Sequence, residues 1–224
     1  MVLESTKTHQ ARDLVKAALE IQGSACLTCS FQIEDMVVLD LVREHAPAIP
    51  VLFLDTGYHF AGLYRYRDEM AARYGLNLIN VLPQQTVAEQ EAQLGILYQS
   101  QPDQCCKLRK VKPLFAALEA YDIWFTGLRR VQSPTRANLQ VRETFPLPGG
   151  KQLEKISPLA DWTDREVWLY AREHAIPALP LYDAGYTSIG CEPCTALPSD
   201  PANARSGRWA GRKLECGIHI AGSQ

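Results

Sequence analysis

The stretch ACLTCSFQIEDMVVLDLV, residues 25–42, contains the pattern that decides the fold of this chain. Residues 25–30 form a short, mostly apolar run of the kind found in a buried strand. A helical pattern follows over residues 34–45, with Glu34 and Asp35 in its first turn, where the helix dipole favours negative charge. A strand that leads directly into a helix is the first half of a βαβ unit, so this stretch predicts a parallel sheet.

The chain continues this alternation on both sides of the stretch. Helices are predicted over residues 9–21, 58–74, 86–97 and 107–121, the last with Pro113 near its start or at a kink. Strands are predicted over residues 51–54, 76–82 and 123–126, and a hairpin at the sheet edge over 141–145 and 152–156. The capping box Thr163–Glu166 starts one more helix, and no long helix is readable from Ile176 onward.

These elements predict one mostly parallel, doubly wound α/β domain over residues 1–200. Residues 201–224 are expected to form an irregular, mobile tail of the same domain. The 224 residues are 46% hydrophobic and 21% charged, which excludes a disordered chain and a coiled coil. No apolar run is long enough to cross a membrane, and the first ten residues have no secretory pattern. We therefore expect a cytoplasmic protein that binds no membrane.

Basic residues cluster although the net charge is −2, a balance that argues against a nucleic-acid binder. Eleven of the 23 lie in three windows without acidic residues: Lys107, Arg109, Lys110, Lys112, Arg129, Arg130, Arg136, Arg205, Arg208, Arg212 and Lys213. Any one window could be a solvated face. Together they favour one convergent site for a small, highly charged anion.

Three loops are expected to border one crevice, because ligands of open parallel sheets bind outside the carboxyl ends of the strands. The candidate binding residues in these loops are Ser30, Phe31, Glu34, Asp35, Leu54, Asp55, Thr56, Gly57, Gly127, Arg129 and Arg130. Backbone N–H groups at the start of the helix after residue 30 suit an anion. Neither a Walker A loop nor the glycine-rich dinucleotide fingerprint is present.

Two close pairs of cysteines, Cys105-Cys106 and Cys191-Glu-Pro-Cys194, indicate a metal centre held between distant segments. Adjacent side chains diverge, which favours an iron–sulfur cluster over one tetrahedral zinc ion. The alternative is that the first pair is incidental and the second is a redox pair. Cys26 and Cys29 lie in a predicted strand, where residues three apart face opposite ways, so both are expected to be buried free thiols.

The seventh cysteine, Cys216, lies in KLECGIH near the end of the chain. Such a cysteine is often an idle thiol. Here basic residues precede it closely and His219 follows, and a positive field favours the nucleophilic thiolate.

Residues 24–219 contain, in this order, the motifs SFQIED, FLDTG, CCKLRKVKPL, TGLRRVQSPTRA, KISPLADWTDREVW, YTSIGCEPCT and GRWAGRKLECGIH. Together they resemble the motifs of the thioredoxin-dependent sulfonucleotide reductases, and most closely those of the assimilatory adenylylsulfate reductases. The resemblance implies an adenine nucleotide alpha hydrolase-like fold. It also implies reduction of adenosine 5′-phosphosulfate to sulfite and AMP in sulfate assimilation, with thioredoxin or glutaredoxin as the reductant.

Residue by residue, the resemblance makes Cys216 the nucleophile, which would carry an S-sulfocysteine intermediate. It implies a four-iron four-sulfur cluster bound by Cys105, Cys106, Cys191 and Cys194. Lys110 matches a lysine between cluster and substrate, while Arg129, Arg130, Arg136, Arg205 and Arg208 match substrate-binding arginines. His219 is a catalytic candidate without an assigned step. Gln32 departs from the family pattern, which usually has glycine there.

Three other functions compete with this interpretation. A 3′-phosphoadenylylsulfate reductase would perform the same chemistry, but such enzymes generally lack the two cysteine pairs. A tRNA-modifying enzyme of the same fold group should carry a Ser-Gly-Gly-x-Asp-Ser loop where this chain has Cys29–Asp35. A non-catalytic iron–sulfur sensor would give Cys216 no task. Whether the chain forms a homo-oligomer is not decided by these motifs.

Overall fold

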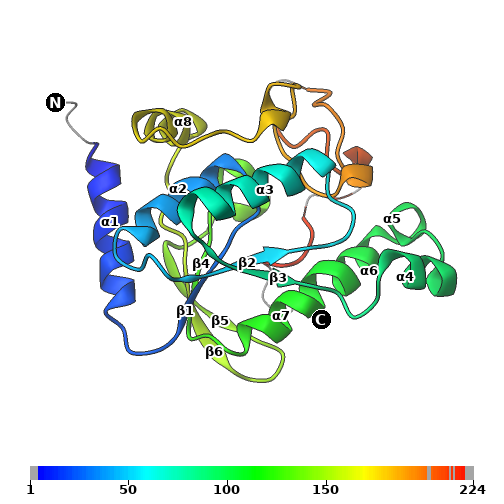
Figure 1. Cartoon of the computed structure of the whole chain (residues 1–224), viewed down its shortest axis with the longest axis horizontal. Coiled ribbons are helices and arrows are strands. Elements are labelled where there is room, and N and C mark those ends of the chain that lie inside the picture. The colour runs from blue at the N-terminus through cyan, green and yellow to red at the C-terminus, as the bar shows by residue number, and fades with distance from the viewer. Residues whose placement is uncertain (1–4, 201–202, 212, 214, 220–224) are drawn as a thin grey trace.

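The computed structural model describes residues 5–200, 203–211, 213 and 215–219. Its centre is a six-stranded sheet in the order β3-β2-β1-β4-β6-β5 (Figure 1). All neighbouring strands are parallel except β5 and β6, which form the expected antiparallel hairpin at the sheet edge. The strands are β1 (Ala25–Thr28), β2 (Pro50–Leu54), β3 (Asn77–Val81), β4 (Ile123–Phe125), β5 (Arg142–Pro146) and β6 (Gln152–Ile156). The predicted α/β fold class is confirmed.

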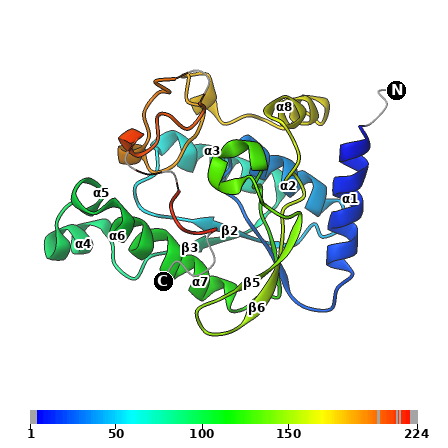
Figure 2. The same cartoon turned by 180° about the vertical axis from the view of Figure 1, so that it is seen from behind.

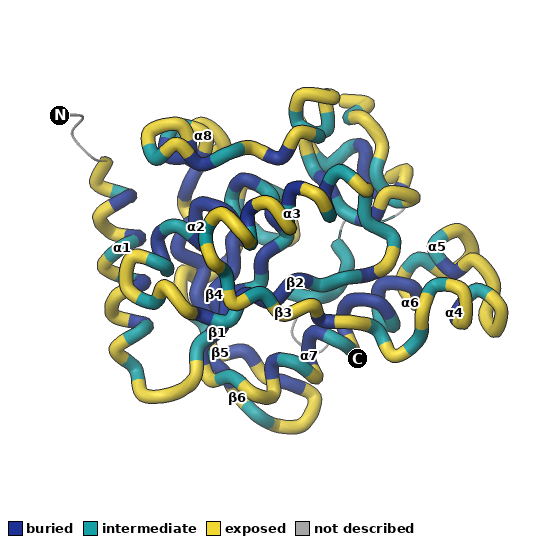
Figure 3. The backbone as a smooth tube through the Cα atoms, viewed as in Figure 1, coloured by how far each residue is buried: buried dark blue, intermediate teal, exposed yellow. Residues whose placement is uncertain are grey.

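Alternating side chains of the strands build two cores, one on each face of the sheet. Leu27, Phe53 and Phe125 contribute to the larger core, beneath α1 (Thr6–Leu19), α2 (Ile33–Arg43), α3 (Ala61–Tyr74) and α8 (Asp164–Glu173). Their neighbours Cys26, Leu52 and Trp124 contribute to the second core with α7 (Lys112–Leu118). The central strands β1, β2 and β4 are therefore buried on both faces, whereas the edge strands β3 and β5 carry exposed residues (Figure 3).

The two cysteines of β1 and its end confirm this alternation. Cys26 lies in the core under α7, and Cys29 lies in the core on the other face. Both are buried, unpaired thiols, as expected. Burial raises the pKa of each thiol well above its ordinary value. This Cys-x-x-Cys string is structural.

Helix boundaries differ from the predictions where tertiary contacts intervene. α3 begins at Ala61 and not at Tyr58, because the segment before it runs extended beside the second cysteine pair, with Glu192 N donating to Tyr58 O at 2.7 Å. The helix predicted over 86–97 ends at Gly95, giving α4 (Val87–Leu94) and a short α5 (Leu97–Ser100). The capping box of Thr163 and Glu166 is present at α8.

The helix predicted over 107–121 is part of a longer, irregular one. It consists of α6 (Pro102–Cys106), a π-helical turn over Lys107–Val111, and α7. Lys112 N donates to Lys107 O, five residues back. Pro113 has no N–H to offer the preceding turn, which accounts for the irregularity just before it. No helix within the described ranges is long and apolar enough to cross a membrane.

Candidate active site

A cleft of about 630 Å³ opens at the carboxyl ends of the parallel strands. The loops after β1 and β4 line it together with the end of β2, residues 187–190 and the C-terminal segment, which is red in Figure 2. Most predicted site residues line this cleft: Ser30, Glu34, Asp35, Leu54, Lys110, Gly127, Arg129, Arg130, Arg136, Arg205, Arg208, Cys216 and His219. Phe31, Asp55, Thr56 and Gly57 do not.

The loop after β1 is held by its own residues. Phe31 has a left-handed backbone with φ of 60° and a fully buried ring, which contacts the rings of Phe53 and Tyr66 edge-on. Asp35 accepts hydrogen bonds from Ser30 N at 2.7 Å and Ser30 Oγ at 2.6 Å. Burial, followed by the charge of Glu34, raises the pKa of Asp35 to about 6. The ring of Phe31 therefore fixes the loop to the core, while the hydrogen bonds from Ser30 to Asp35 hold the two ends of the loop together.

Gln32 connects this loop to the segment before the second cysteine pair. Its Oε1 accepts from Ile189 N at 2.8 Å, and its Nε2 donates to Ser30 Oγ at 3.2 Å. A glycine, the residue usual in the resembling family, could make neither bond. Gln32, which stands where the family usually has glycine, thus links two walls of the cleft.

Residues 55–57 of the loop after β2 turn away from the cleft, and His59 of the same loop lines it again. Asp55 accepts hydrogen bonds from Tyr64 Oη at 2.5 Å and Gly57 N at 3.0 Å. Thr56 is fully buried, and its hydroxyl lies 3.2 Å from Cys191 Sγ. This loop therefore borders the cleft at Leu54 and His59, as the sequence predicted for Leu54, while Thr56 supports the cysteine site.

Six Lys and Arg side chains of the described residues line the cleft, and four of them have carboxylate partners. Arg129 pairs with Asp164 at 2.6 Å, and Arg130 contacts Asp161. Arg136 and Arg205 both pair with Glu215. Among the described residues, Lys110 and Arg208 pair with no carboxylate, although only 9% and 6% of their surfaces are exposed. Buried cations without counter-ions indicate a place for an anion.

The three basic windows converge only in part. Arg109 lies outside the cleft and donates to Thr56 O at 2.5 Å and to Gln90 Oε1 at 3.0 Å. Lys213 pairs with Asp103 at 2.7 Å. Arg212 lies outside the described residues. Charge density along the sequence therefore overstates the number of cations available to a ligand.

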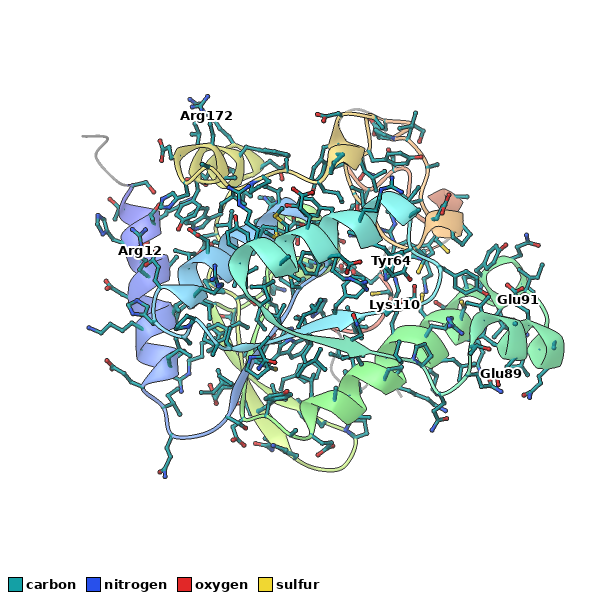
Figure 4. The ribbon with its side chains drawn as sticks, in the orientation of Figure 1. Arg12, Tyr64, Glu89, Glu91, Lys110 and Arg172 are labelled. Atoms are coloured by element: carbon teal, nitrogen blue, oxygen red, sulfur yellow. The ribbon has the colours of Figure 1, made fainter. Side chains whose placement is uncertain are left out.

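Lys110 lies between two sites. It lines the cleft and also the small cavity formed by the two cysteine pairs, and Figure 4 shows it beside yellow sulfur atoms in the region between α3 and α6. Burial alone would lower the pKa of Lys110, but the neighbouring Cys191, Cys216 and Cys106 raise it above its ordinary value. The ammonium group therefore stays charged.

The cysteine cavity brings together Cys105, Cys106, Cys191 and Cys194, 84 residues of chain separating the two pairs. The first pair ends α6, and the second flanks a short 3₁₀ turn over Glu192–Cys194, with Cys191 just before the turn and Cys194 as its last residue. All four are unpaired thiols, and burial followed by the neighbouring cysteines raises the pKa of Cys105 to about 12. Across the described ranges, no three His, Cys, Asp or Glu side chains are placed to hold a metal ion.

The C-terminal segment brings Cys216 to the cleft. Lys110, Arg205 and Arg208 each lie close enough to Cys216 to interact with it electrostatically. Beyond it, the ring of His219 stacks on Trp124 at 5.4 Å between centroids. Burial, aided by nearby cations, lowers the pKa of His219 well below its ordinary value. Its ring is therefore neutral, and its Nδ1 is buried without a hydrogen-bond partner among the described atoms.

Comparison with known proteins places this cleft in a family. The sequence pattern of the "Phosphoadenosine phosphosulfate reductase domain" matches residues 24–197. The chain belongs to this family. The Mycobacterium tuberculosis protein named adenosine 5′-phosphosulfate reductase is 46% identical over 203 residues, which span 87% of this chain and 78% of that protein. The Mycobacteroides abscessus protein of the same name is 47% identical over 216 residues, or 94% and 88% of the two chains. The family resemblance seen in the motifs is thus confirmed.

Solved structures agree with membership of the phosphoadenosine phosphosulfate reductase family. The phosphoadenylyl-sulfate reductase of Candida auris, in a phosphate complex, matches with a TM-score of 0.73 and 26% identity over 87% of this chain and 99% of that one. The FMN adenylyltransferase of Candida glabrata matches with a TM-score of 0.61 at 18% identity, over 89% of this chain and 70% of that one. The second likeness shows the shared fold alone.

Sequence reasoning missed three residues of the cleft that the structure makes prominent. Gln32 links two walls, Gln132 donates to Glu34 Oε1 at 2.6 Å, and Glu215 meets the arginines. Gln32 was visible only as a departure from the family pattern, and Glu215 only as an acidic residue beside Cys216 that interrupts an otherwise basic segment. Its partners lie about 80 and 10 residues away, beyond any local pattern.

Proposed function

We propose that this protein is an oxidoreductase that converts adenosine 5′-phosphosulfate to sulfite and AMP for sulfate assimilation, with Cys216 as nucleophile. The relatives of 46–47% identity named adenosine 5′-phosphosulfate reductase support this substrate. Residues 201–224 act in this proposal as the catalytic tail. We place the reaction in the cytosol, where small dithiol proteins stay reduced.

The observation that carries the proposal is the set of charges around Cys216. Lys110 and Arg208 are buried, have no described carboxylate partner, and interact with the Cys216 sulfur. Fixed cations next to a nucleophilic thiol stabilise the thiolate and the charge that develops on an anionic substrate during attack. A cleft of about 630 Å³ is large enough for a nucleotide.

In the first step, the Cys216 thiolate attacks the sulfate sulfur of the substrate. An S–S bond forms and the S–O bond to the phosphate breaks, so AMP leaves with the negative charge on its phosphate and the sulfonate stays on Cys216. The cations of the cleft hold both anions during this transfer. The His219 ring, stacked on Trp124, helps to seat the tail and, being neutral, adds no repelling cation beside Cys216.

The second step requires a dithiol from outside the chain. Cys105, Cys106, Cys191 and Cys194 lie together in their own cavity, so none is a natural resolving thiol for Cys216. A thioredoxin- or glutaredoxin-type thiolate attacks Cys216 Sγ and displaces sulfite. The second thiol of that partner then releases Cys216 and leaves the partner oxidised to a disulfide, which balances the two-electron reduction of sulfur.

We further propose that Cys105, Cys106, Cys191 and Cys194 hold one four-iron four-sulfur cluster. Their donor set suits a cluster with several iron atoms, because four unpaired cysteines line one cavity and the cations Lys110 and Arg208 interact with them, although no three of the described side chains are placed to hold a single metal ion. When bound, the cluster would supply negative charge beside Lys110 and tune the field at the substrate. The chain itself supplies the nucleophile and the anion-binding groups.

A 3′-phosphorylated substrate is the second candidate. The family description and the Candida auris structure of 26% identity both carry the name of that activity. The two cysteine pairs and the relatives of higher identity favour the substrate without the 3′-phosphate. Turnover of the two nucleotides under identical conditions distinguishes them, and a strong preference for the 3′-phosphorylated one would overturn our choice.

The decisive experiment omits the reductant. The enzyme is purified without oxygen, incubated with adenosine 5′-phosphosulfate alone, and analysed by mass spectrometry. We expect one sulfonate group on the peptide that contains Cys216, and none in a Cys216→Ser variant that keeps its brown colour. Absence of the sulfonate from the wild-type peptide would disprove the mechanism.

A further inference from the structure

The carboxylate of Glu215 pairs with two arginines that line the cleft, Arg136 and Arg205. Its Oε1 accepts from Arg136 Nε at 3.0 Å and its Oε2 from Arg136 Nη2 at 2.9 Å, a two-pronged contact. Thr135 Oγ1 donates to Oε1 at 3.0 Å, and Arg205 Nη2 lies 3.6 Å from Oε2. Both carboxylate oxygens are therefore satisfied by groups that line or border the cleft.

This pairing is well shielded from solvent. The exposed fractions of the side chains are 10% for Glu215, 13% for Arg136 and 20% for Arg205. Burial opposes the charge of Glu215, but its bonds to Arg136 and the charge of Arg205 lower its pKa overall. A shielded fork of this kind is stronger than an exposed ion pair.

The ion pair of Glu215 with the arginines matters because of where Glu215 lies in the chain. Glu215 directly precedes Cys216, so its Cα lies about 3.8 Å from that of the nucleophile. On the other side of Cys216, Ile218 packs against the second core, under α7, and His219 stacks on Trp124. Cys216 is thus held between an ionic anchor and an apolar one.

The ionic anchor has a competitor. Guanidinium groups bind carboxylate and phosphate with the same geometry, and Arg136 and Arg205 line the cleft in which we place the nucleotide. A phosphate that approaches them must share them with Glu215 or displace it. The apolar anchor has no such competitor.

We propose that Glu215 is a positioning residue, an internal anion that seats Cys216 over the cleft and competes with the nucleotide phosphate for Arg136 and Arg205. This inference rests on the proposed function. Attack on the sulfate needs the tail seated, whereas the second step needs the sulfonated Cys216 to leave the cleft. Cleavage of the S–O bond leaves a further negative charge on the AMP phosphate, which strengthens the competition at the moment when the tail must be released.

The test is Glu215→Gln in the cluster-containing enzyme, with Glu154→Gln as the matched control. Glu154 accepts from Arg142 Nε at 2.7 Å in the edge hairpin, outside the cleft. Glu215→Gln should bind AMP about tenfold more tightly by calorimetry, because the arginines lose their competitor, and should form the Cys216 sulfonate about tenfold more slowly in a single turnover. Glu154→Gln should change neither quantity.

Tighter binding of AMP together with slower sulfonation of Cys216 distinguishes this role from a loss of structure. A loss of structure would lower both the AMP affinity and the sulfonation rate. Unchanged or weaker AMP binding by Glu215→Gln would overturn the proposal. Hydrogen exchange of the peptide over residues 209–219 without any nucleotide gives an independent measurement. Faster exchange in Glu215→Gln supports the anchor, and wild-type exchange refutes it. This last measurement decides the anchor even if the wild-type enzyme forms no sulfonate, a result that would defeat the proposed function alone.

Discussion

The backbone of Gly127 lies directly against the carboxylate of Asp35. A Cβ atom at position 127 would stand 2.2 Å from Asp35 Oδ1, a distance that no side chain can occupy. The loop after β4 therefore meets the first turn of α2 here with only the Asp35 carboxylate between them, and glycine is required by this close approach.

The first prediction follows from this contact. Gly127→Ala should push Asp35 away from Ser30 and open the loop after β1, which lowers the free energy of unfolding by about 1–3 kcal/mol and AMP affinity by about tenfold. Thermal or urea unfolding and calorimetry measure the two effects. Gly62→Ala in α3 is the matched control, because its Cβ would meet nothing closer than 3.8 Å. Equal behaviour of the two variants would contradict the prediction.

The second prediction concerns pH. The pKa of Asp35 is raised from 3.8 to about 6, so the folded protein binds this proton more tightly than the unfolded chain does. The stabilising contribution of Asp35 is complete below its unfolded pKa and is lost as the pH rises through about 6. Relative to Asp35→Asn, the wild type should lose up to about 3 kcal/mol of unfolding free energy between pH 4 and 7. A pH-independent difference between the two proteins would show that Asp35 titrates normally.

The third prediction separates the cysteines by their position. Cys194→Ser should remove the brown colour and the iron of the purified protein, because it takes one donor from the cysteine cavity. Cys26→Ser should keep both, since Cys26 lies in the core under α7. Iron analysis and the visible spectrum provide the measurement. A colourless wild type that contains zinc would show that the metal assignment is wrong.

The fourth prediction tests the cations of the cleft. Arg208→Lys removes a buried guanidinium group that packs closely against the backbone of Gly190. We expect kcat/KM for adenosine 5′-phosphosulfate to fall by about a hundredfold, as is usual when a donor to developing charge is lost. Lys112→Ala, an exposed residue of the same basic window as Lys110, should retain wild-type activity. Parallel losses in both variants would point to a general electrostatic effect.

The sequence predicted the fold well because the fold depends on repeating patterns. Alternating faces placed Cys26 and Cys29 in different cores, and the capping box at Thr163 marked the start of α8. Both signals are local, so they survive folding unchanged. The hairpin after β4 was equally readable from its turn residues.

The site was predicted less completely because loop side chains take their direction from distant partners. Thr56 faces Cys191, 135 residues away, and Arg109 is held by Thr56 O and Gln90. Phe31 looks like a binding residue in its motif, but its ring is drawn into the core by Phe53 and Tyr66. These contacts join residues that are far apart in the chain, so the spacing of residues in the sequence does not predict them.

The π-helical turn over Lys107–Val111 limits the insertions and deletions that this segment can accept without loss of function. Each residue of a helix rotates the chain by about 100°, so loss of a single codon between Cys106 and Lys110 would turn the lysine toward a different neighbour. The shortened protein could keep its sheet, its helices and all seven thiols. Its cysteine cavity and its cleft would no longer share a cation, although the four cysteines of the cavity and Lys110 itself would all still be present.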